Sequence, residues 1–184
     1  MSVFEESKKE EYKFNEEEEN YITKLRESVK KKADYDLRRV IGITKRLRDK
    51  VDTGTKDEFG DPIEDWDKLS TNDLINFFSE GSAWNFFSAP IKMQAFIESS
   101  LSEVVYKYEF NTILSSLTDG TVAQRNATAE LQAQQNNFAA LYKKMYADYI
   151  TEVLRSFDGW LRRVERVINF RQMEERMTPN RNPF

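Results

Sequence analysis

The sequence contains no cysteine and no histidine. These absences exclude disulfides, thiol nucleophiles and imidazole bases, and with them nearly every type of zinc site. Glycine and proline are scarce, with 6 and 4 residues among 184, which disfavours an all-β fold. No apolar run approaches the ~20 residues that span a bilayer, and the acidic N-terminal segment does not resemble a signal peptide. We therefore expect a cytoplasmic protein with no membrane partner.

Charge is abundant but unevenly distributed. The net charge is -4, yet residues 1–20 carry eight Glu against three Lys, and residues 22–50 carry eleven Lys or Arg against four Asp or Glu. Residues 52–67 are acidic again. We therefore divide the chain into four segments. They are an acidic N-terminal tail (1–20), a basic helix with an acidic loop (21–67), a helical hairpin or bundle core (68–177) and a disordered tail (178–184).

Apolar residues at helical spacing predict helices over 17–51, from about Ser70 to Pro90, over 91–117 and over 121–176. Ser70 is a candidate N-cap with Asp73 in the first turn, although Thr71 and Asn72 are also possible caps. Gly120 is expected to stop the third helix. The fold class that follows is all-α, an elongated helical bundle with long antiparallel coiled-coil-like helices.

The last predicted helix carries a wide apolar face. One stripe alternates spacings of four and three, and comprises Ile150, Leu154, Phe157, Leu161, Val164 and Ile168. A second stripe beside it comprises Tyr146, Val153, Trp160 and Val167. Such a face needs two partners, so the helix either folds back near residues 134–137 or at Gly159, or another subunit covers the remainder. In helix 91–117 the same spacing predicts one buried stripe of Ile97, Leu101, Val104 and Tyr108.

Basic side chains recur every seven residues along the predicted helix 17–51, in two neighbouring rows. Because seven residues are nearly two helical turns, both rows share one side of the helix. Cations follow a phosphate backbone, and an aromatic ring among them offers a base a stacking surface. The candidate nucleic-acid-binding residues on this helix are Lys24, Lys31, Lys32, Tyr35, Arg38, Arg39, Lys45 and Arg46. The alternative is a solvated face that pairs with the acidic tail or with the acidic loop.

An aromatic cluster is a candidate interface with an oligomer or a protein partner. Five large rings lie within eleven residues, and a tryptophan of the last helix joins them as a candidate. These residues are Phe77, Phe78, Trp84, Phe86, Phe87 and Trp160. Exposed aromatic patches generally mark an interface, but a hydrophobic plug that packs the short helix against the later helices is the alternative.

The remaining charged groups suggest little chemistry. The arginines of the last helix are interpreted mainly as partners in intrahelical ion pairs, for example Arg162 with Glu165. The Asp-rich loop lacks the alternating ligands of an EF-hand, so a hard-cation site there is only a remote possibility. No nucleophile motif and no phosphate-binding glycine motif is present. We therefore predict no catalytic residues, no metal and no cofactor.

From residue 68 onward the sequence resembles a family of small helical phage proteins found with replication and recombination genes. The resemblance lies in KLSTNDLINFFSEG, in SLTDGTVAQRNATAELQAQ and in WLRRVERVINFRQMEER. The family's (E/D)GTVAER-like segment reads here as Asp119 to Arg125, with Gln124 in place of the usual Glu. In plan the family is similar to the UvsY-like recombination mediators of T-even phages. That resemblance implies a helical homo-oligomer that binds single-stranded DNA and assists a recombinase or a single-strand-binding protein. For a phage protein, the compartment is the host cell cytoplasm.

Two function hypotheses follow. The first is a recombination mediator that binds single-stranded DNA through the basic helix, with Arg125 added because it lies in the matched segment. The second is a phage-encoded protein–protein interaction module, a host-factor regulator or a virion assembly factor, that does not bind nucleic acid. The acidic net charge and the aromatic cluster favour the second hypothesis, and the basic rows favour the first.

Overall fold

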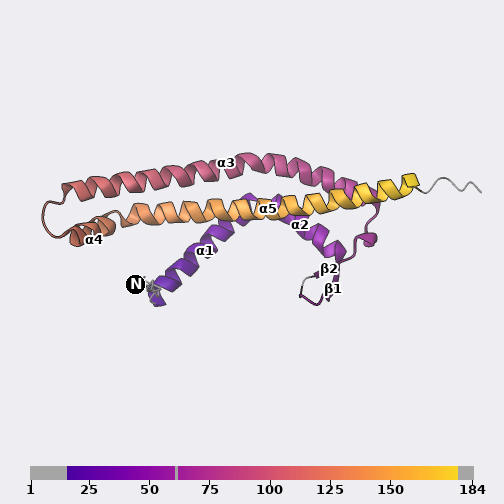
Figure 1. Ribbon diagram of the computed structural model, residues 1–184, viewed down its shortest axis with the longest axis horizontal. Helices are drawn as coiled ribbons and strands as arrows, with labels where there is room; N and C mark the ends of the chain where they lie inside the picture. Colours follow the sequence, from indigo (N-terminus) through magenta and orange to yellow (C-terminus); the bar gives the residue numbers. More distant parts are fainter. Residues whose placement is uncertain (1–15, 61, 178–184) are drawn as a thin grey trace, which may run out of the picture.

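Two long antiparallel helices dominate the computed structural model, which describes residues 16–60 and 62–177 (Figure 1). α3 (Thr71–Ser116) and α5 (Gln134–Met177) lie side by side, and each is roughly 65–70 Å long at ~1.5 Å per residue. A short helix, α4 (Val122–Gln132), connects them at one end of the molecule. The predicted class, an elongated all-α fold with long antiparallel helices, is confirmed.

Local sequence signals set where two of these helices begin. The Ser70 hydroxyl accepts a hydrogen bond from the Asp73 backbone N–H at 3.1 Å, and the Asp73 carboxylate accepts one from the Ser70 N–H at 3.3 Å. Thr121 and Gln124 form the same reciprocal capping box at the start of α4. Gly120 has a φ of +93°, a conformation that glycine adopts without strain. Ser70 is thus the cap of α3, and Gln124 still satisfies a backbone group where the resembled segment has Glu.

The N-terminal helix is kinked rather than continuous. α1 (Glu16–Asp36) and α2 (Arg38–Val51) meet at Leu37, so the uninterrupted helix expected over 17–51 is wrong at this residue. Backbone hydrogen bonds of 2.8 Å and 3.0 Å continue on either side of the kink, and the Leu37 side chain is buried. Figure 1 shows α1 and α2 as two arms that diverge from the middle of α5. The bend lets both arms pack against α5, although neither Gly nor Pro occupies its apex.

The segment expected to be a loop over 52–68 contains a small antiparallel hairpin. Its strands are β1 (Asp52–Lys56) and β2 (Pro62–Glu64), and a 3-10 turn, η1 (Trp66–Lys68), follows. The Asp65 N–H donates to the carbonyl of Val51 at 2.7 Å, which fixes the base of the hairpin to the end of α2. Acidic composition concealed this hairpin because Asp is a poor strand former.

Two further expected helix boundaries differ. α3 continues through Pro90, which lies on the exposed side of the helix, where the loss of one backbone hydrogen bond costs less than it would in the core. The expected helix over 121–176 is interrupted at Ala133, next to the predicted position 134–137. Ala129 and Ala133 are fully buried, so the short helix approaches its neighbours through small side chains.

The core lies along the central and C-terminal parts of α5. Every member of the first predicted stripe is buried, namely Ile150, Leu154, Phe157, Leu161, Val164 and Ile168. The second stripe is covered by α1, α2 and η1 of the same chain, and Trp160, for example, packs against Trp66 at 6.1 Å between ring centroids. The same chain therefore supplies partners for this stripe, and the helix is interrupted at Ala133, beside the predicted 134–137, and not at Gly159. Over the described ranges, no helix combines the length and apolarity needed to cross a bilayer.

The stripe expected to be buried on helix 91–117 lies in solvent. Ile97, Leu101, Val104 and Tyr108 have exposed fractions of 50%, 59%, 62% and 74%. α3 instead packs on α5 through its opposite face, where Gly81, Ser88 and Ala95 are buried at intervals of seven residues. The 4-3-4 spacing does place these four residues on one face of the helix, but spacing alone does not determine which of two apolar faces meets the neighbouring helix.

Candidate nucleic-acid interface on α1 and α2

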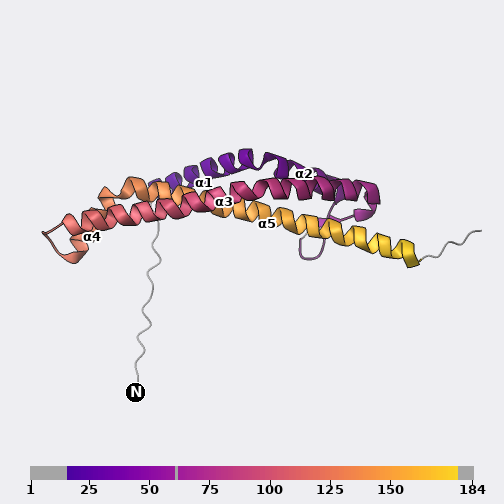
Figure 2. The ribbon, with the colours of Figure 1, turned by 90° about the horizontal axis from the view of Figure 1, so that it is seen from above.

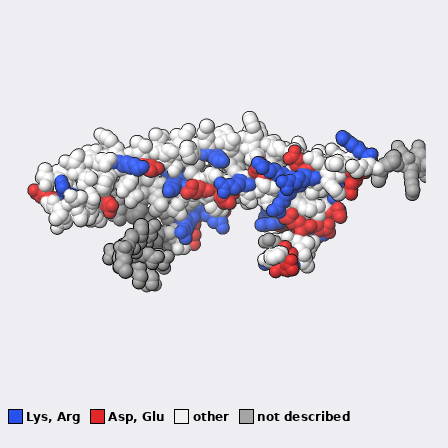
Figure 3. All heavy atoms as spheres, viewed as in Figure 1, with Lys and Arg blue, Asp and Glu red and all other residues white. Residues whose placement is uncertain are grey.

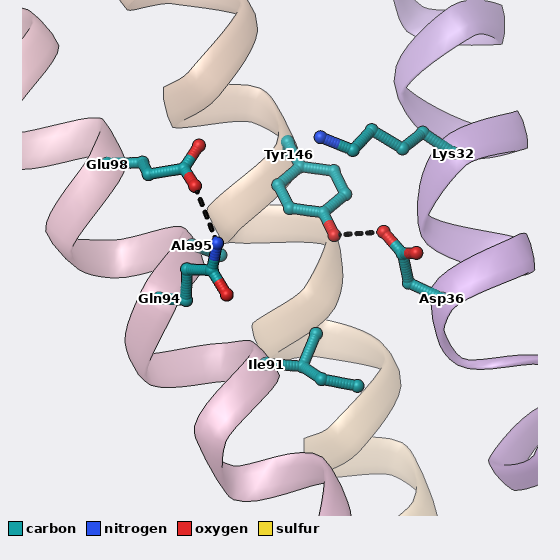
Figure 4. Close-up of a pocket in the computed structure, with 7 residues that line it drawn as sticks. All are labelled: Lys32, Asp36, Ile91, Gln94, Ala95, Glu98 and Tyr146. Carbon is teal, nitrogen blue, oxygen red and sulfur yellow. Dashed lines mark hydrogen bonds between the residues drawn. The ribbon is translucent and has the colours of Figure 1, made fainter.

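Two tyrosines of α5 fix the orientation of the first arm. The Tyr146 hydroxyl donates a hydrogen bond to the Asp36 carboxylate, and the Tyr149 hydroxyl donates to Asp34 at 3.1 Å. Figure 4 shows Asp36 and Tyr146 directed toward each other across the gap between α1 and α5. The Lys32 ammonium lies 4.6 Å from the centre of the Tyr146 ring, a cation–π distance. These contacts turn two carboxylates of the basic segment inward.

The outer surface of α1 and α2 is consequently cationic. Of the four acidic residues within 22–50, only Glu27 and Asp49 remain exposed, since Asp34 and Asp36 are half-buried. The eleven basic residues of the same segment are all exposed, and they are Lys24, Arg26, Lys30, Lys31, Lys32, Arg38, Arg39, Lys45, Arg46, Arg48 and Lys50. Figure 3 shows Lys and Arg side chains over the middle of the molecule, with Asp and Glu side chains among them, whereas charge is sparse toward the α4 end.

The two predicted rows have different surroundings. The row of Lys24, Lys31, Arg38 and Lys45 is exposed on both arms, although the kink at Leu37 changes its direction. The row of Lys32, Arg39 and Arg46 faces α3 and α5. The Arg39 guanidinium lies 5.8 Å from the Trp84 ring centre, and Arg46 forms an ion pair with Glu80 at 2.8 Å. The second row is therefore exposed but engaged with both long helices, so the first row is the better candidate for binding a ligand.

An aromatic–arginine pair lies beside the kink. The Tyr35 ring is 67% exposed, and the Arg38 guanidinium stacks over it at 4.6 Å from the ring centre. Arg38 also donates a hydrogen bond to the Tyr35 carbonyl at 3.1 Å. A ring held open to solvent beneath a guanidinium offers a flat cationic surface on which a base can stack. Tyr35 and Arg38 thus lie side by side next to the kink.

Arg125 does not belong to this surface. It lies on α4, at one end of the molecule, whereas the other eight candidates lie on α1 and α2 (Figure 1). Its guanidinium donates to the Leu117 carbonyl at 3.4 Å, and its Nε is buried without a hydrogen-bond partner among the described residues. The contact closes the connection between α3 and α4, which gives Arg125 a structural role in the segment that carries the family resemblance.

A pocket of about 270 Å³ lies where α1, α3 and α5 meet. Its charged and polar lining residues are Lys32, Asp36, Gln94, Glu98 and Tyr146. Burial and the hydrogen bond to Asp36 raise the pKa of the Tyr146 hydroxyl well above its ordinary range, so the hydroxyl stays protonated and remains a donor. Lys143 forms a 3.8 Å ion pair with Glu98, which balances the charge at the rim. The polar residues of this pocket thus connect α1, α3 and α5 through a hydrogen bond and an ion pair.

Replacing Tyr146 by Phe is expected to lower the free energy of unfolding by about 1–3 kcal/mol at pH 7, because Asp36 loses its donor in a half-buried site. The pKa of Tyr146 is raised in the fold. The stability that the hydroxyl supplies is therefore complete below the unfolded pKa of about 10 and is lost as the pH rises further.

Urea midpoints measured from pH 7 to above pH 10 test this expectation. The difference in urea midpoint between the wild-type protein and Tyr146→Phe should stay constant up to about pH 10, and it should become smaller above that pH. Tyr35→Phe is the matched control. Because Tyr35 is exposed, the loss of its hydroxyl should leave the urea midpoint unchanged. Equal midpoints for Tyr146→Phe and wild type at pH 7 would show that the hydrogen bond to Asp36 does not hold the arm.

The predicted aromatic cluster is divided between the core and the surface. Phe77, Phe78 and Trp84 are half-buried against the core residues around Phe157, as the packing alternative expected, and Phe77 and Phe78 also pack against those around Val164. Phe86 and Phe87 are 77% and 61% exposed, and only they remain available to a partner. Trp160 is half-buried against Trp66, as described above.

Charged groups on α5 and in the hairpin are largely engaged. Arg162 pairs with Asp158 at 2.9 Å, not with the expected Glu165, and Arg163 reaches Glu64 of β2 at 2.8 Å. Arg171 donates to the carbonyl of Leu69 at 2.6 Å and to that of Trp66 at 2.8 Å, which ties the start of α3 to α5. The contacts of Arg163 and Arg171 escape sequence analysis because they join residues about one hundred positions apart. Within the described ranges, no group of acidic residues is arranged to hold a metal ion.

The fold and this surface together define an elongated all-α protein in which a kinked cationic arm packs against a two-helix spine. No family model, no curated protein and no solved structure matches the chain significantly.

Proposed function

We propose that the protein is an accessory factor of phage-type recombination that binds single-stranded DNA through the outer face of α1 and α2. In this role it assists a recombinase or a single-strand-binding protein, as the resemblance to UvsY-like mediators implies. The observation that carries the proposal is the inward orientation of Asp34 and Asp36, which are bound to tyrosines of α5. A chain with a net charge of -4 thereby presents one strongly cationic face.

Geometry and chemistry on this face suit a single strand. The exposed row places a cation every seven residues, or about 10 Å along each helix axis. Tyr35 and Arg38 add a stacking surface where the two arms meet. Stacking accepts any base, and phosphate contacts carry no sequence information, so the expected binding is independent of sequence.

Fluorescence anisotropy of a labelled single-stranded oligonucleotide across a salt series tests the proposal. Wild-type binding should weaken log-linearly with salt, and Lys31→Glu, Arg38→Glu and Lys45→Glu combined should weaken it by tenfold or more at low salt. Each phosphate contact that is lost should lower the salt slope by about 0.7.

A charge-matched control carries three reversals away from this face, at Lys92, Lys144 and Arg176, all exposed on α3 and α5. This control should bind nearly as well as wild type, because net charge changes equally in both variants. Equal losses in the two variants would mean that only overall charge matters. Absence of wild-type binding at low salt would contradict the proposal.

One observation favours the second candidate, a protein–protein interaction module. The outer face of α3 exposes large apolar side chains, among them Phe86, Met93 and Phe96 with exposed fractions of 77%, 66% and 68%. Exposed patches of this kind mark interfaces with other proteins. If the oligonucleotide does not bind, this face becomes the main guide to function.

A further inference from the structure

The outer face of α3 carries a continuous apolar row, here called the α3 stripe. It comprises Phe86, Pro90, Met93, Ile97, Leu101, Val104 and Tyr108. Pro90 is exposed, and the exposed fractions of the other six side chains lie between 50% and 77%. The stripe contains no charged residue, and in Figure 3 the upper margin of the molecule, formed by α3, is nearly free of charge.

The stripe is straight. Successive members are separated by 4, 3, 4, 4, 3 and 4 residues, an eleven-residue pattern that repeats from Phe86 to Ile97 and from Ile97 to Tyr108. Eleven residues in three turns give ~3.67 residues per turn, so the row drifts little around a helix of ~3.6. It therefore runs along the axis for about 33 Å at ~1.5 Å per residue.

α3 is apolar on two opposite faces. The inner face, with Gly81, Ser88 and Ala95, is buried against α5, and the stripe lies half a turn away from it. Helices that are apolar on all sides are normally buried on all sides. Figures 1 and 2 show α1 and α2 beside α5, and they leave the outer edge of α3 uncovered. The chain itself thus covers one face of α3 and not the other.

We propose that the α3 stripe is the interface of a homodimer, in which the same stripe of a second copy packs antiparallel around a two-fold axis at Ile97. The spacing of the stripe reads the same in both directions from Ile97. An antiparallel partner therefore places Ile97 against Ile97, Met93 against Leu101 and Phe86 against Tyr108, large side chains facing large ones. A two-fold interface requires a surface that is complementary to itself. The stripe meets this requirement because its spacing is symmetric about Ile97 and because it has no charges that would repel each other.

The available area is sufficient for such a dimer. Side chains of this size, exposed by half or more, offer on the order of 800 Å² of apolar surface per chain, which matches the ~800 Å² per partner of a standard interface. Phe87, Phe96 and Val105 flank the stripe with exposed fractions of 61%, 68% and 52% and widen it. The proposal rests on this stripe and not on the proposed function. If both hold, a dimer with two cationic arms gains avidity for one strand.

Sedimentation velocity of the full chain without nucleic acid, over a concentration series, tests the proposal. Wild type should have about twice the chain mass of 21.7 kDa. The double variant Ile97→Glu and Leu101→Glu should be monomeric at the same concentrations. Because both side chains are exposed within one chain, its circular dichroism should be unchanged. The matched control, Leu131→Glu with Phe170→Glu, places the same charges on exposed apolar positions of α4 and α5 and should stay dimeric.

Crosslinking through introduced cysteines tests the antiparallel register. Because the chain contains no cysteine of its own, each introduced cysteine is a unique crosslinking site. A short bifunctional maleimide should join two copies of Ile97→Cys. It should join Phe86→Cys to Tyr108→Cys in a mixture, but it should not join Tyr108→Cys to itself. Efficient crosslinking of Tyr108→Cys to itself would overturn the antiparallel arrangement. A wild-type protein that is monomeric at every concentration would overturn the dimer. The same holds if the monomer binds phospholipid vesicles instead. This outcome does not depend on whether the protein binds an oligonucleotide.

Discussion

Gly81→Val is expected to lower the free energy of unfolding by about 2 kcal/mol, since overpacking a close helix contact costs ~1–3 kcal/mol. A Cβ at position 81 would lie 2.4 Å from Leu161 Cδ2 and 3.3 Å from Phe157 Cζ. Both contacted side chains are buried in the core, so they have little room to move away. The higher helix propensity of valine offsets only ~0.5 kcal/mol of this loss.

Urea denaturation followed by circular dichroism measures the effect, with Gly159→Ala as the matched control. Gly159 is exposed on α5, and a Cβ there meets nothing within 4 Å. The control should therefore gain up to ~1 kcal/mol from helix propensity alone. An unfolding free energy for Gly81→Val equal to that of wild type would mean that α3 and α5 approach each other less closely than the structure has them.

Phe157→Ala is expected to have the largest effect of any single truncation, about 3–5 kcal/mol, the range for large aromatic residues removed from a core. The Phe157 side chain is 2% exposed, lies at the centre of α5 and contacts the position of Gly81. It belongs to the apolar cluster that joins α1, α2, α3 and α5, so its removal weakens all four helices together.

Phe170→Ala is the control for this truncation, because it removes the same side chain from the same helix. Phe170 is 62% exposed, and its loss should change the unfolding free energy by no more than ~0.5 kcal/mol. Thermal unfolding at fixed protein concentration compares the two variants. Similar melting temperatures for both would contradict the placement of the core along the centre of α5.

The candidate site was only partly predictable. Seven-residue spacing identified the exposed row that includes Lys31 and Lys45, because that spacing repeats on one side of any helix. It did not separate this row from the one containing Arg39 and Arg46, which meets Trp84 and Glu80. Helical periodicity states which residues share a side, but it does not state which side a distant helix will cover.

The further inference depends on a similar ambiguity. The spacing of Ile97, Leu101 and Val104 was recognised as an apolar stripe, and the structure shows that it is exposed. The signal that could have identified the inner face is the interval of seven between Gly81, Ser88 and Ala95, since small residues permit close helix approach. Large apolar side chains give the stronger hydrophobic signal, so a row of small residues does not stand out in the sequence.

The sequence by itself determined the all-α class and the burial of the α5 stripe around Phe157, and it restricted the cap of α3 to Ser70, Thr71 or Asn72. These features depend on neighbours within one or two helical turns, which a sequence displays directly. Only the tertiary structure decided the kink at Leu37, the inward orientation of Asp34 and Asp36, and the face of α3 that meets α5. Those features arise where residues far apart in the sequence come together, and their energies depend on packing that no local pattern records.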